Sequence, residues 1–333
     1  MLSRKAKRVL RGLSAAAGVL VLAACTGPTA ADPAGGTANA TGSATAGGPM
    51  HIAVVTHGTA GDAFWNVVKN GATDAGKQLA VNVDYNSDGD PGAQSKLIDN
   101  AVAQKVDGLV VSMANPDALK SSVQRAVKAG IPVVTINSGQ AQSASYGAIA
   151  HVGQDEAIAG RQAGARLRSE GRTKLLCVIH EAGNVGLNQR CDGAKQGFGG
   201  QASTLQVDIS NPTDVEARIK GALQTDSSID AVLTLNPQVA LSAANAVRDS
   251  NAKAVVSTFD LNADVVNAIK AGQVDFAVDQ QQYEQGYLPI VMLKLYHDNA
   301  NTVGGGQPVL TGPGFVDKSN VDKVAQYASR GTR

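Results

Sequence analysis

Polar side chains follow each short β-branched run in this sequence. In the first half of the chain they are His57, Asp62, Asn115, Asn137 and Ser138, and in the second half His180, Glu181, Asn236, Asp260, Asp279 and Gln280. An amide offers a donor and an acceptor in one rigid plane, and a carboxylate offers two acceptors, so pairs of such groups can hold vicinal hydroxyls. These residue types predict a binding site for a hydroxyl-rich ligand.

The stretch "GDAFWN" adds an apolar element to these polar groups. It places Trp65, the single Trp among 333 residues, beside Phe64, one of five Phe. Flat aromatic faces complement the C–H faces of a sugar or polyol and leave its hydroxyl edges free for amides and carboxylates. We therefore expect Phe64 and Trp65 to form the apolar wall of the site. The alternative is that either aromatic is simply the first core residue of its helix.

The elements that carry these residues alternate regularly along the chain. Strands are predicted at 51–56, 81–85, 108–112, 132–136, 174–179, 205–209, 231–235, 254–258 and 276–278, with helices at 64–79, 93–104, 116–129, 156–169, 188–198, 215–223, 239–248, 263–271 and 283–296. Such alternation predicts parallel sheets with helices on both faces, and ligands bind at the carboxyl ends of such strands. A folded part of roughly 280 residues suits two α/β domains.

The N-terminus has the pattern of an exported lipoprotein. Residues 1–11 carry five Lys or Arg, a short apolar run follows, and Leu22-Ala23-Ala24 precedes Cys25. This pattern predicts a signal peptide over 1–24 and lipidation of Cys25 on the outer face of a bacterial cytoplasmic membrane. The alternative is an ordinary signal peptide with a chance Cys. Residues 25–50 consist mostly of small side chains, which predicts a flexible tether.

Charge and cysteine content narrow the classes further. The signal segment holds five of the 29 basic residues, so the mature chain has 24 basic against 28 acidic residues and a net charge of −4. No basic stripe is present in the sequence, and we expect no nucleic-acid partner. Cys177 and Cys191 form an even pair in an exported chain, which predicts a disulfide. The alternative is two buried thiols.

Successive blocks of the sequence resemble one known family. They include "IAVVTHGTAGDAFWNVVKNGATDAGKQL", "VDGLVVSMANPDAL", "VKAGIPVVTINS", "HVGQDEAIAGRQAG", "QRCDGAKQGF", "AVLTLNPQVALSAANAV", "VVSTFD" and "FAVDQQQYEQGY". In this order, over residues 51–310, they are similar to the ribose-binding-protein group of periplasmic binding proteins, the solute receptors of ATP-binding cassette sugar importers. The resemblance implies two Rossmann-like lobes joined by a three-stranded hinge, which close on a monosaccharide.

The same resemblance implies an organisation, partners and ligand contacts. The lobes would be 51–152 plus 281–309 and 153–280 plus 310–333, in a monomer that binds sugar without catalysis or cofactor and delivers it to a permease. Matching the family's motifs implies the ligand contacts Asp62, Phe64, Trp65, Asn115, Asn137, Ser138, Arg190, Asn236, Phe259, Asp260 and Gln280, with Asn188 as the alternative to Arg190. Ribose binders carry an acidic and a basic residue where Asn137 and Ser138 stand, so another pentose, a hexose, an inositol or a linear polyol replaces ribose as the expected ligand.

Four other functions are weighed against sugar transport. A metal site built from His57, His151, His180 and Glu181 matches no zinc spacing. A glycoside hydrolase would need two carboxylates flanking a bond, and Asp62 with Asp260 could supply them. A receptor for a sensory kinase would bind the same ligand. Transcription regulators of this fold begin with a DNA-binding helix-turn-helix, where this sequence has a predicted export signal.

Overall fold

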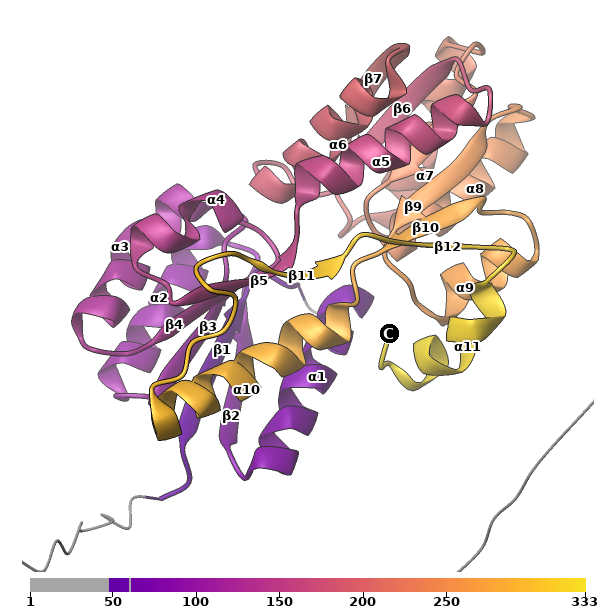
Figure 1. The fold of residues 1–333 in the computed structure, drawn as a ribbon. Coiled ribbons are helices and arrows are strands. Elements are labelled where there is room, and N and C mark those ends of the chain that lie inside the picture. The colour runs from indigo at the N-terminus through magenta and orange to yellow at the C-terminus, as the bar shows by residue number, and fades with distance from the viewer. Residues whose placement is uncertain (1–47, 60) are drawn as a thin grey trace, which may run out of the picture. The chain divides into compact units, whose positions relative to one another are not determined.

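The computed structural model describes residues 48–59 and 61–333, and two six-stranded sheets organise them (Figure 1). The predicted signal peptide, Cys25 and the tether up to residue 47 lie outside the described residues. Within the described part no helix is long and apolar enough to cross a bilayer.

The first lobe is a parallel sheet covered on both faces. Its strands are β1 (His51–Thr56), β2 (Asn82–Ser87), β3 (Gly108–Ser112), β4 (Val133–Ile136), β5 (Ala150–Gln154) and β11 (Val309–Gly312), in the order β11-β5-β4-β3-β1-β2. Along β1, Ile52 and Val54 pack in one core while Ala53 and Val55 pack in the other. This alternation arises because successive side chains of a strand point to opposite faces.

Four long helices cover this sheet. Helices α1 (Ala63–Leu79) and α10 (Gln282–Asn299) pack together on one face, and α2 (Pro91–Ala103) and α3 (Pro116–Lys128) pack together on the other. A short helix, α4 (Gln140–Ser143), and the turn η1 (Ala144–Tyr146) join β4 to β5. The first lobe is therefore completed by residues far apart in the sequence, because α10 and β11 come from the last quarter of the chain.

The second lobe repeats the plan with one reversed strand. Its sheet has the order β12-β10-β9-β8-β6-β7, with β6 (Lys174–Ile179), β7 (Gln201–Gln206), β8 (Ala231–Thr234), β9 (Val255–Phe259), β10 (Phe276–Asp279) and β12 (Gly314–Asp317), and β12 is antiparallel to β10. Helices α5 (Glu156–Ser169) and α6 (Val185–Phe198) cover one face, and α7 (Pro212–Thr225), α8 (Pro237–Ser250), α9 (Ala263–Lys270) and α11 (Val321–Arg330) cover the other. Cys177 of β6 and Cys191 of α6 are joined by a disulfide in the core.

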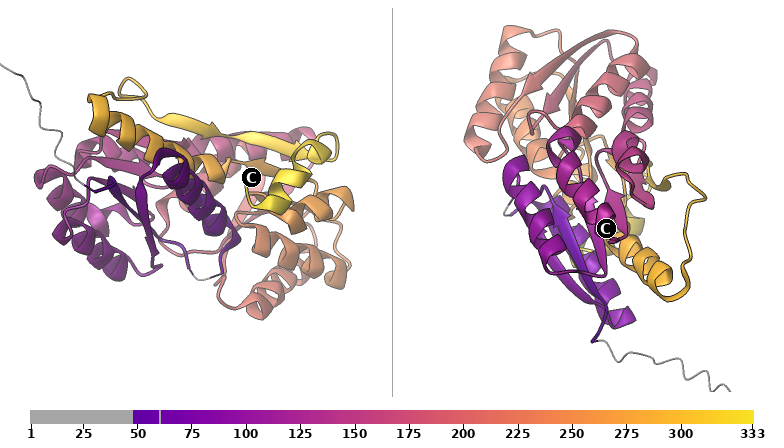
Figure 2. Two further views of the ribbon diagram at one scale, coloured as in Figure 1. Left: turned by 90° about the horizontal axis from the view of Figure 1, so that it is seen from below. Right: turned by 90° about the vertical axis from the view of Figure 1, so that its left-hand side faces the viewer.

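The chain passes between the lobes three times, which forms the hinge. The passages follow β5, β10 and β11, and Figure 2 shows the last of them as the yellow segment that runs from one sheet to the other. The family resemblance implies lobe boundaries at residues 152 and 309. The first falls within β5 and the second at the start of β11, the strands that lead into the hinge. The division into lobes at these residues stays a proposal.

The predicted alternation of strands and helices is confirmed, and the main differences concern strands β5, β7, β11 and β12. The sequence did not predict strands β5, β11 and β12, because they are short and their apolar residues are interrupted by Gly or polar residues. Helix α11 was not predicted either. The predicted strand at 205–209 begins earlier, as β7 at Gln201, since its register is set by pairing Gln201 with Lys174 of β6. An edge strand with exposed side chains carries a weak apolar signal.

Candidate functional site

A polar cavity lies between the lobes, at the carboxyl ends of the strands. Side chains of the two lobes nearly fill it, because only about 20 Å³ is open to the centres of water-sized molecules. Its walls are formed by His57, Asp62, Phe64, Trp65, Asn137, His180, Glu181, Asn184, Leu187, Arg190, Leu235, Asn236, Asp260 and Gln280.

The aromatic wall is built by the loop between β1 and α1. Asp62 caps α1, since its Oδ1 accepts a hydrogen bond of 2.8 Å from the Phe64 amide, and the cap directs the first helical turn at the cavity. The rings of Phe64 and Trp65 meet edge to face with their centroids 4.9 Å apart. Gly58 makes room for this arrangement, because a Cβ on it would lie 2.4 Å from Trp65 Cγ. Phe64 and Trp65 also contribute to the core of the first lobe. Each ring is therefore both a core residue and part of the cavity wall.

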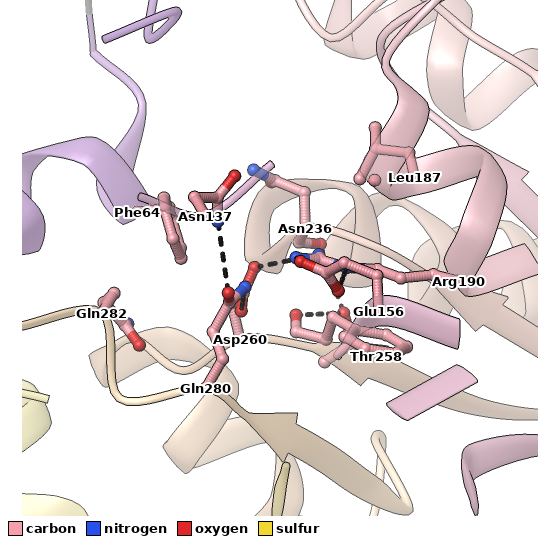
Figure 3. Close-up of polar contacts among 12 residues, drawn as sticks. Phe64, Asn137, Glu156, Leu187, Arg190, Asn236, Thr258, Asp260, Gln280 and Gln282 are labelled. Atoms are coloured by element: carbon pink, nitrogen blue, oxygen red, sulfur yellow. Dashed lines mark hydrogen bonds and ion pairs between the residues drawn. The ribbon is translucent and has the colours of Figure 1, made fainter. Parts of the chain in front are cut away.

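A buried ion-pair network forms the wall of the second lobe (Figure 3). Arg190 Nε and Nη2 donate to the two carboxylate oxygens of Glu156 at 2.6 and 2.8 Å, and Arg190 Nη1 lies 3.8 Å from Asp260 Oδ2. The guanidinium also stacks 4.7 Å from the ring centroid of Phe259. Helices α5 and α6 can approach closely enough for this pairing because Gly160 has no side chain. A Cβ at this position would lie 2.1 Å from the Arg190 carbonyl oxygen. Glu156 thus positions Arg190 at the cavity.

Amides join the two lobes on the hinge side of the cavity. Asn137 Nδ2 donates to Gln280 Oε1 at 3.2 Å, and Gln280 Nε2 donates to Asp260 Oδ1 at 2.6 Å (Figure 3). Asn137 and Asp260 both have positive φ angles, 59° and 70°. Non-glycine residues rarely adopt this conformation, and where they do it is associated with functional sites. The strained backbone holds both side chains toward the cavity.

Asn236 and two leucines complete the second-lobe surface. Asn236 caps α8 through its Oδ1, which accepts a hydrogen bond of 2.8 Å from the Gln238 amide, and Figure 3 shows its side-chain nitrogen on the side facing Asn137. Leu187 and Leu235 are buried and line the cavity. The apolar surface of the cavity therefore comes from both lobes, with aromatic rings on one lobe and leucines on the other.

The side of the cavity away from the hinge is closed by two histidines, a glutamate and an asparagine. Glu181 Oε2 lies 3.8 Å from His57 Nε2, and Glu181 Oε1 lies 3.9 Å from His180 Nε2. Asn184 Nδ2 donates to Glu181 Oε2 at 2.7 Å. These residues also line a second, larger cavity that opens beyond them. We call His57, His180, Glu181 and Asn184 the mouth cluster.

The carboxylates of the cavity have little cationic compensation. Burial raises the pKa of Asp260 to about 7, against the opposing effects of Arg190 and Gln280, and burial raises the pKa of Asp62 to about 6. Burial likewise lowers the pKa of His180 to about 4 and lowers the pKa of His57. At neutral pH both imidazoles are therefore neutral, while Arg190 is already paired with Glu156. The site disfavours phosphorylated or acidic ligands.

Eight of the twelve predicted contact residues line the cavity: Asp62, Phe64, Trp65, Asn137, Arg190, Asn236, Asp260 and Gln280. The other four lie behind or beside it. Asn115 caps α3 and lines the outer cavity. Ser138 is buried and donates to Asn137 Oδ1 and Asn184 Oδ1. Phe259 lies under Arg190, and Asn188 is absent from the lining because its side chain projects from a different part of the α6 surface than Arg190.

The expected ligand contacts left out His57, His180 and Glu181, which the sequence interpretation had named as polar residues after strands. It did not single out Asn184, Glu156, Leu187 or Leu235. His180 and Glu181 directly follow a strand, so their position was a usable signal. Asn184 could have been found as the N-cap of α6, since its Oδ1 accepts from the Gly186 amide at 2.9 Å. The predicted start of that helix at 188 concealed it. Glu156 depends on the packing of α5 against α6, for which the local sequence has no signal.

A polar cavity between two hinged α/β lobes is the arrangement of a solute-binding protein. A family model described as a periplasmic binding protein domain matches residues 52–300. The chain belongs to this periplasmic binding protein family, in the group of the ribose-binding proteins.

Individual relatives support this assignment. The chain is 26% identical over 237 residues to the ribose import binding protein of Haemophilus influenzae, covering 68% of this chain and 79% of that one. It is similar to the crystal structure of a carbohydrate transporter from Acidothermus cellulolyticus 11B in complex with myo-inositol, with 44% identity, a TM-score of 0.84 and coverage of 86% of this chain and 100% of that one. A solute-binding protein from Agrobacterium vitis with bound D-fucose is 25% identical, with a TM-score of 0.74 and coverage of 84% and 99%.

Proposed function

We propose that this protein is the receptor for a neutral single-ring polyol, with inositol as the first candidate, and that it delivers the bound ligand to an ATP-binding cassette permease. The observation that carries the proposal is the distribution of groups around the cavity. Carboxylates, amides and imidazoles surround it on the hinge side and at the mouth, while its apolar residues come in two groups, one from each lobe.

This distribution suits a cyclitol better than a pyranose. A ring between Phe64 or Trp65 on one lobe and Leu187 or Leu235 on the other would place its C–H faces on apolar surface. Its edge would then meet polar groups in every direction. A cyclitol carries a hydroxyl on each ring carbon, whereas a pyranose has a ring oxygen that can only accept. The resemblance to a carbohydrate transporter crystallised with myo-inositol supports the same choice.

Binding would proceed by closure of the lobes. The ligand first contacts one lobe, and contacts from the other lobe then favour the closed state. The equilibrium between the open and closed states shifts by the difference in the ligand's binding free energy for the two states. The hydrogen bond between Asn137 and Gln280 joins the lobes near the hinge, and the backbone bond from Val185 N to Ala114 O, 3.0 Å long, joins them near the mouth. Ligand contacts would add to these bonds.

The test is a binding panel on the chain from residue 26 onward. Titration calorimetry and Trp65 fluorescence are followed with myo-inositol, its stereoisomers, pentoses, hexoses and linear polyols, and the compounds are recovered to check for turnover. We expect saturable binding strongest for one inositol, with the compound recovered unchanged. Asp260→Asn should lower that affinity, while Asp117→Asn, the same chemical change on α3 outside the cavity, should not. Binding confined to pentoses or hexoses would reject inositol, and turnover would reject a receptor role.

We also propose that Cys25 carries the lipid anchor, on the strength of the Leu22-Ala23-Ala24-Cys25 sequence. Detergent phase partitioning of the full chain expressed in a bacterial host tests this proposal. The wild-type chain should enter the detergent phase and incorporate labelled palmitate, and Cys25→Ser should do neither. Equal partitioning of the two chains would leave an ordinary signal peptide as the explanation.

A further inference from the structure

The mouth cluster places one carboxylate between two imidazoles that come from different lobes. Glu181 follows β6 in the second lobe, as does His180, while His57 follows β1 in the first. Both histidines are buried, with exposed fractions of 5% and 6%. The Glu181 carboxylate approaches the Nε2 atom of each ring. Both rings therefore present the same nitrogen to Glu181.

The hydrogen bonds of His57 determine which of its nitrogens carries the proton. Ser112 Oγ accepts a 3.0 Å hydrogen bond from the His57 backbone amide and lies 2.7 Å from His57 Nδ1. Asn184 Nδ2, which can only donate, lies 3.4 Å from His57 Nε2, so Nε2 is the acceptor and the ring proton sits on Nδ1, where it is donated to Ser112 Oγ. His57 is therefore fully hydrogen-bonded within the protein.

His180 keeps an unused acceptor. Its Nε2 lies 3.9 Å from Glu181 Oε1, beyond hydrogen-bond range, and the negative charge of that carboxylate favours the neutral ring with the proton on Nε2. Its Nδ1 is then an acceptor, and this atom is buried without a hydrogen-bond partner among residues 48–59 and 61–333. His180 lines the cavity between the lobes. A buried unpaired acceptor costs free energy, which a ligand hydroxyl would recover.

We propose that His180 is a specificity-determining residue whose Nδ1 accepts a hydrogen bond from a ligand hydroxyl on the mouth side, and that Glu181 is a positioning residue that holds His180 in the required tautomer. This inference rests on the proposed function and deepens it, because it names the chemistry that the mouth side of the ligand must present. The ligand needs an O–H donor at that ring position. A ring oxygen, an ether or a deoxygenated carbon cannot supply one.

Ser138 and Gly186 show how the fold keeps the mouth cluster in place. Asn184 Oδ1 accepts from the Gly186 amide at 2.9 Å and from Ser138 Oγ at 3.3 Å, which leaves its amide nitrogen for Glu181. Asn184 thus anchors Glu181 Oε2, and the same amide nitrogen lies 3.4 Å from His57 Nε2. The carboxylate is fixed by the protein and does not depend on the ligand for its orientation.

The experiment combines His180 variants with ligands that lack single hydroxyls. His180→Leu removes the acceptor, and His180→Asn places an amide oxygen where Nδ1 stands. Titration calorimetry is run on both variants and on the wild type with myo-inositol and with each monodeoxy derivative of it. We expect His180→Leu to weaken myo-inositol binding about tenfold, or about 1.4 kcal/mol, and to leave the affinity for one particular monodeoxy derivative unchanged. His180→Asn should retain most of the affinity.

A purely structural role would give a different pattern. His180→Leu would then weaken every ligand by the same factor, and that result, or no weakening of any ligand, would overturn the proposal. Thermal denaturation of each variant shows whether the fold is kept, and His180→Asn provides the test if His180→Leu does not fold. Glu181→Ala should reduce the discrimination against the same monodeoxy derivative without removing it.

The two levels of inference fail separately. If the wild type binds a hexose and no inositol, the proposed ligand is wrong, and the same set of variants is run with that hexose and its deoxy derivatives. Coupling between His180 and one hydroxyl would then still support the role of His180. If the wild type binds inositol and no such coupling is found, the proposed function stands and the role of His180 is rejected.

Discussion

Ionisation of Asp260 should control ligand affinity at neutral pH. The carboxyl is 2% exposed, its Oδ1 accepts from Gln280 Nε2 at 2.6 Å, and Arg190, 3.8 Å away, is shared with Glu156. Burial raises its pKa from 3.8 to about 7. A ligand hydroxyl donates a stronger hydrogen bond to the carboxylate than to the carboxylic acid, so binding favours the ionised form. Ligand binding should therefore release a proton from Asp260 near pH 7.

The size of the effect follows from these pKa values. Affinity for a neutral polyol should be constant above about pH 7 and should weaken by up to about tenfold per pH unit below it. Asp62, with a pKa of about 6, adds a second proton below pH 6 and steepens the loss. Asp260→Asn replaces a charged acceptor by a neutral one, which costs about 1.5–3 kcal/mol, or roughly 10- to 150-fold at pH 8. Between pH 7 and 6 the variant should keep only the loss due to Asp62, about twofold, because Asp62 is half protonated at its pKa of about 6.

Titration calorimetry from pH 5 to pH 8, in pairs of buffers with different heats of ionisation, measures both the affinity and the protons released. Asp117→Asn serves as the control and should keep the wild-type profile. A wild-type affinity that does not change from pH 5 to 8, or an Asp260→Asn variant with the same slope between pH 7 and 6 as the wild type, would refute the reasoning.

The ligand-free protein should show the opposite pH dependence in its stability. Because the pKa of Asp260 is higher in the folded protein than in the unfolded chain, the resulting stability is complete below about pH 4 and is lost as pH rises through 7. About three pKa units correspond to at most ~4 kcal/mol, less where lobe opening hydrates the carboxyl. Between pH 5 and 8 the wild type should therefore lose more stability than Asp260→Asn in urea denaturation. A parallel loss in both proteins would contradict this expectation.

Three further predictions concern the supports of the site. Cys177→Ser opens a loop with a sequence separation of 14 and should lower the free energy of unfolding by about 3 kcal/mol. The wild type in reductant should show the same loss, and unequal values would point to a different role for the disulfide. Glu156→Gln leaves the Arg190 guanidinium without its buried carboxylate and should cost about 3–5 kcal/mol in urea denaturation, whereas a loss under 1 kcal/mol would mean that the pair is not the main support. Gly58→Ala would place a methyl group 2.4 Å from Trp65 Cγ. The variant should therefore shift the Trp65 fluorescence emission and lower polyol affinity severalfold. An unchanged spectrum and affinity would show that the loop adapts.

The core of the fold was predictable because buried parallel strands appear as continuous apolar runs. Strand β3, GLVVS, is buried along its whole length and was predicted with its observed bounds. Edge strands lack that signal, and β7 has mostly exposed or half-exposed residues. Its bounds depend on pairing with β6, which is a long-range interaction. The positions that sequence reasoning placed least well are therefore those determined by a neighbouring strand.

The site was predictable where topology alone places a residue. Asn137 and Asp260 directly follow a strand, and Asn236 follows β8 after one residue, so the end of each strand fixes their place at the cavity. Glu156 could not be predicted in this way, because its role depends on the close approach of α5 to α6 that Gly160 permits. Ser138 has the right position in the chain, but the hydrogen bonds it donates to Asn137 and Asn184 turn it away from the cavity.

The three passages through the hinge also constrain the order in which the protein can be completed during synthesis. The first lobe lacks α10 and β11 until residue 312 is available, by which point the sequence of nearly the whole second lobe has already been made. Before that point Val68, Ala72 and Ala75 of α1 have no partner helix to cover them. A ribosome-bound or truncated chain ending near residue 155 should therefore stay incompletely folded, exposing an apolar surface to chaperones. The second lobe, apart from β12 and α11, is contiguous in the chain and is the part best placed to fold first.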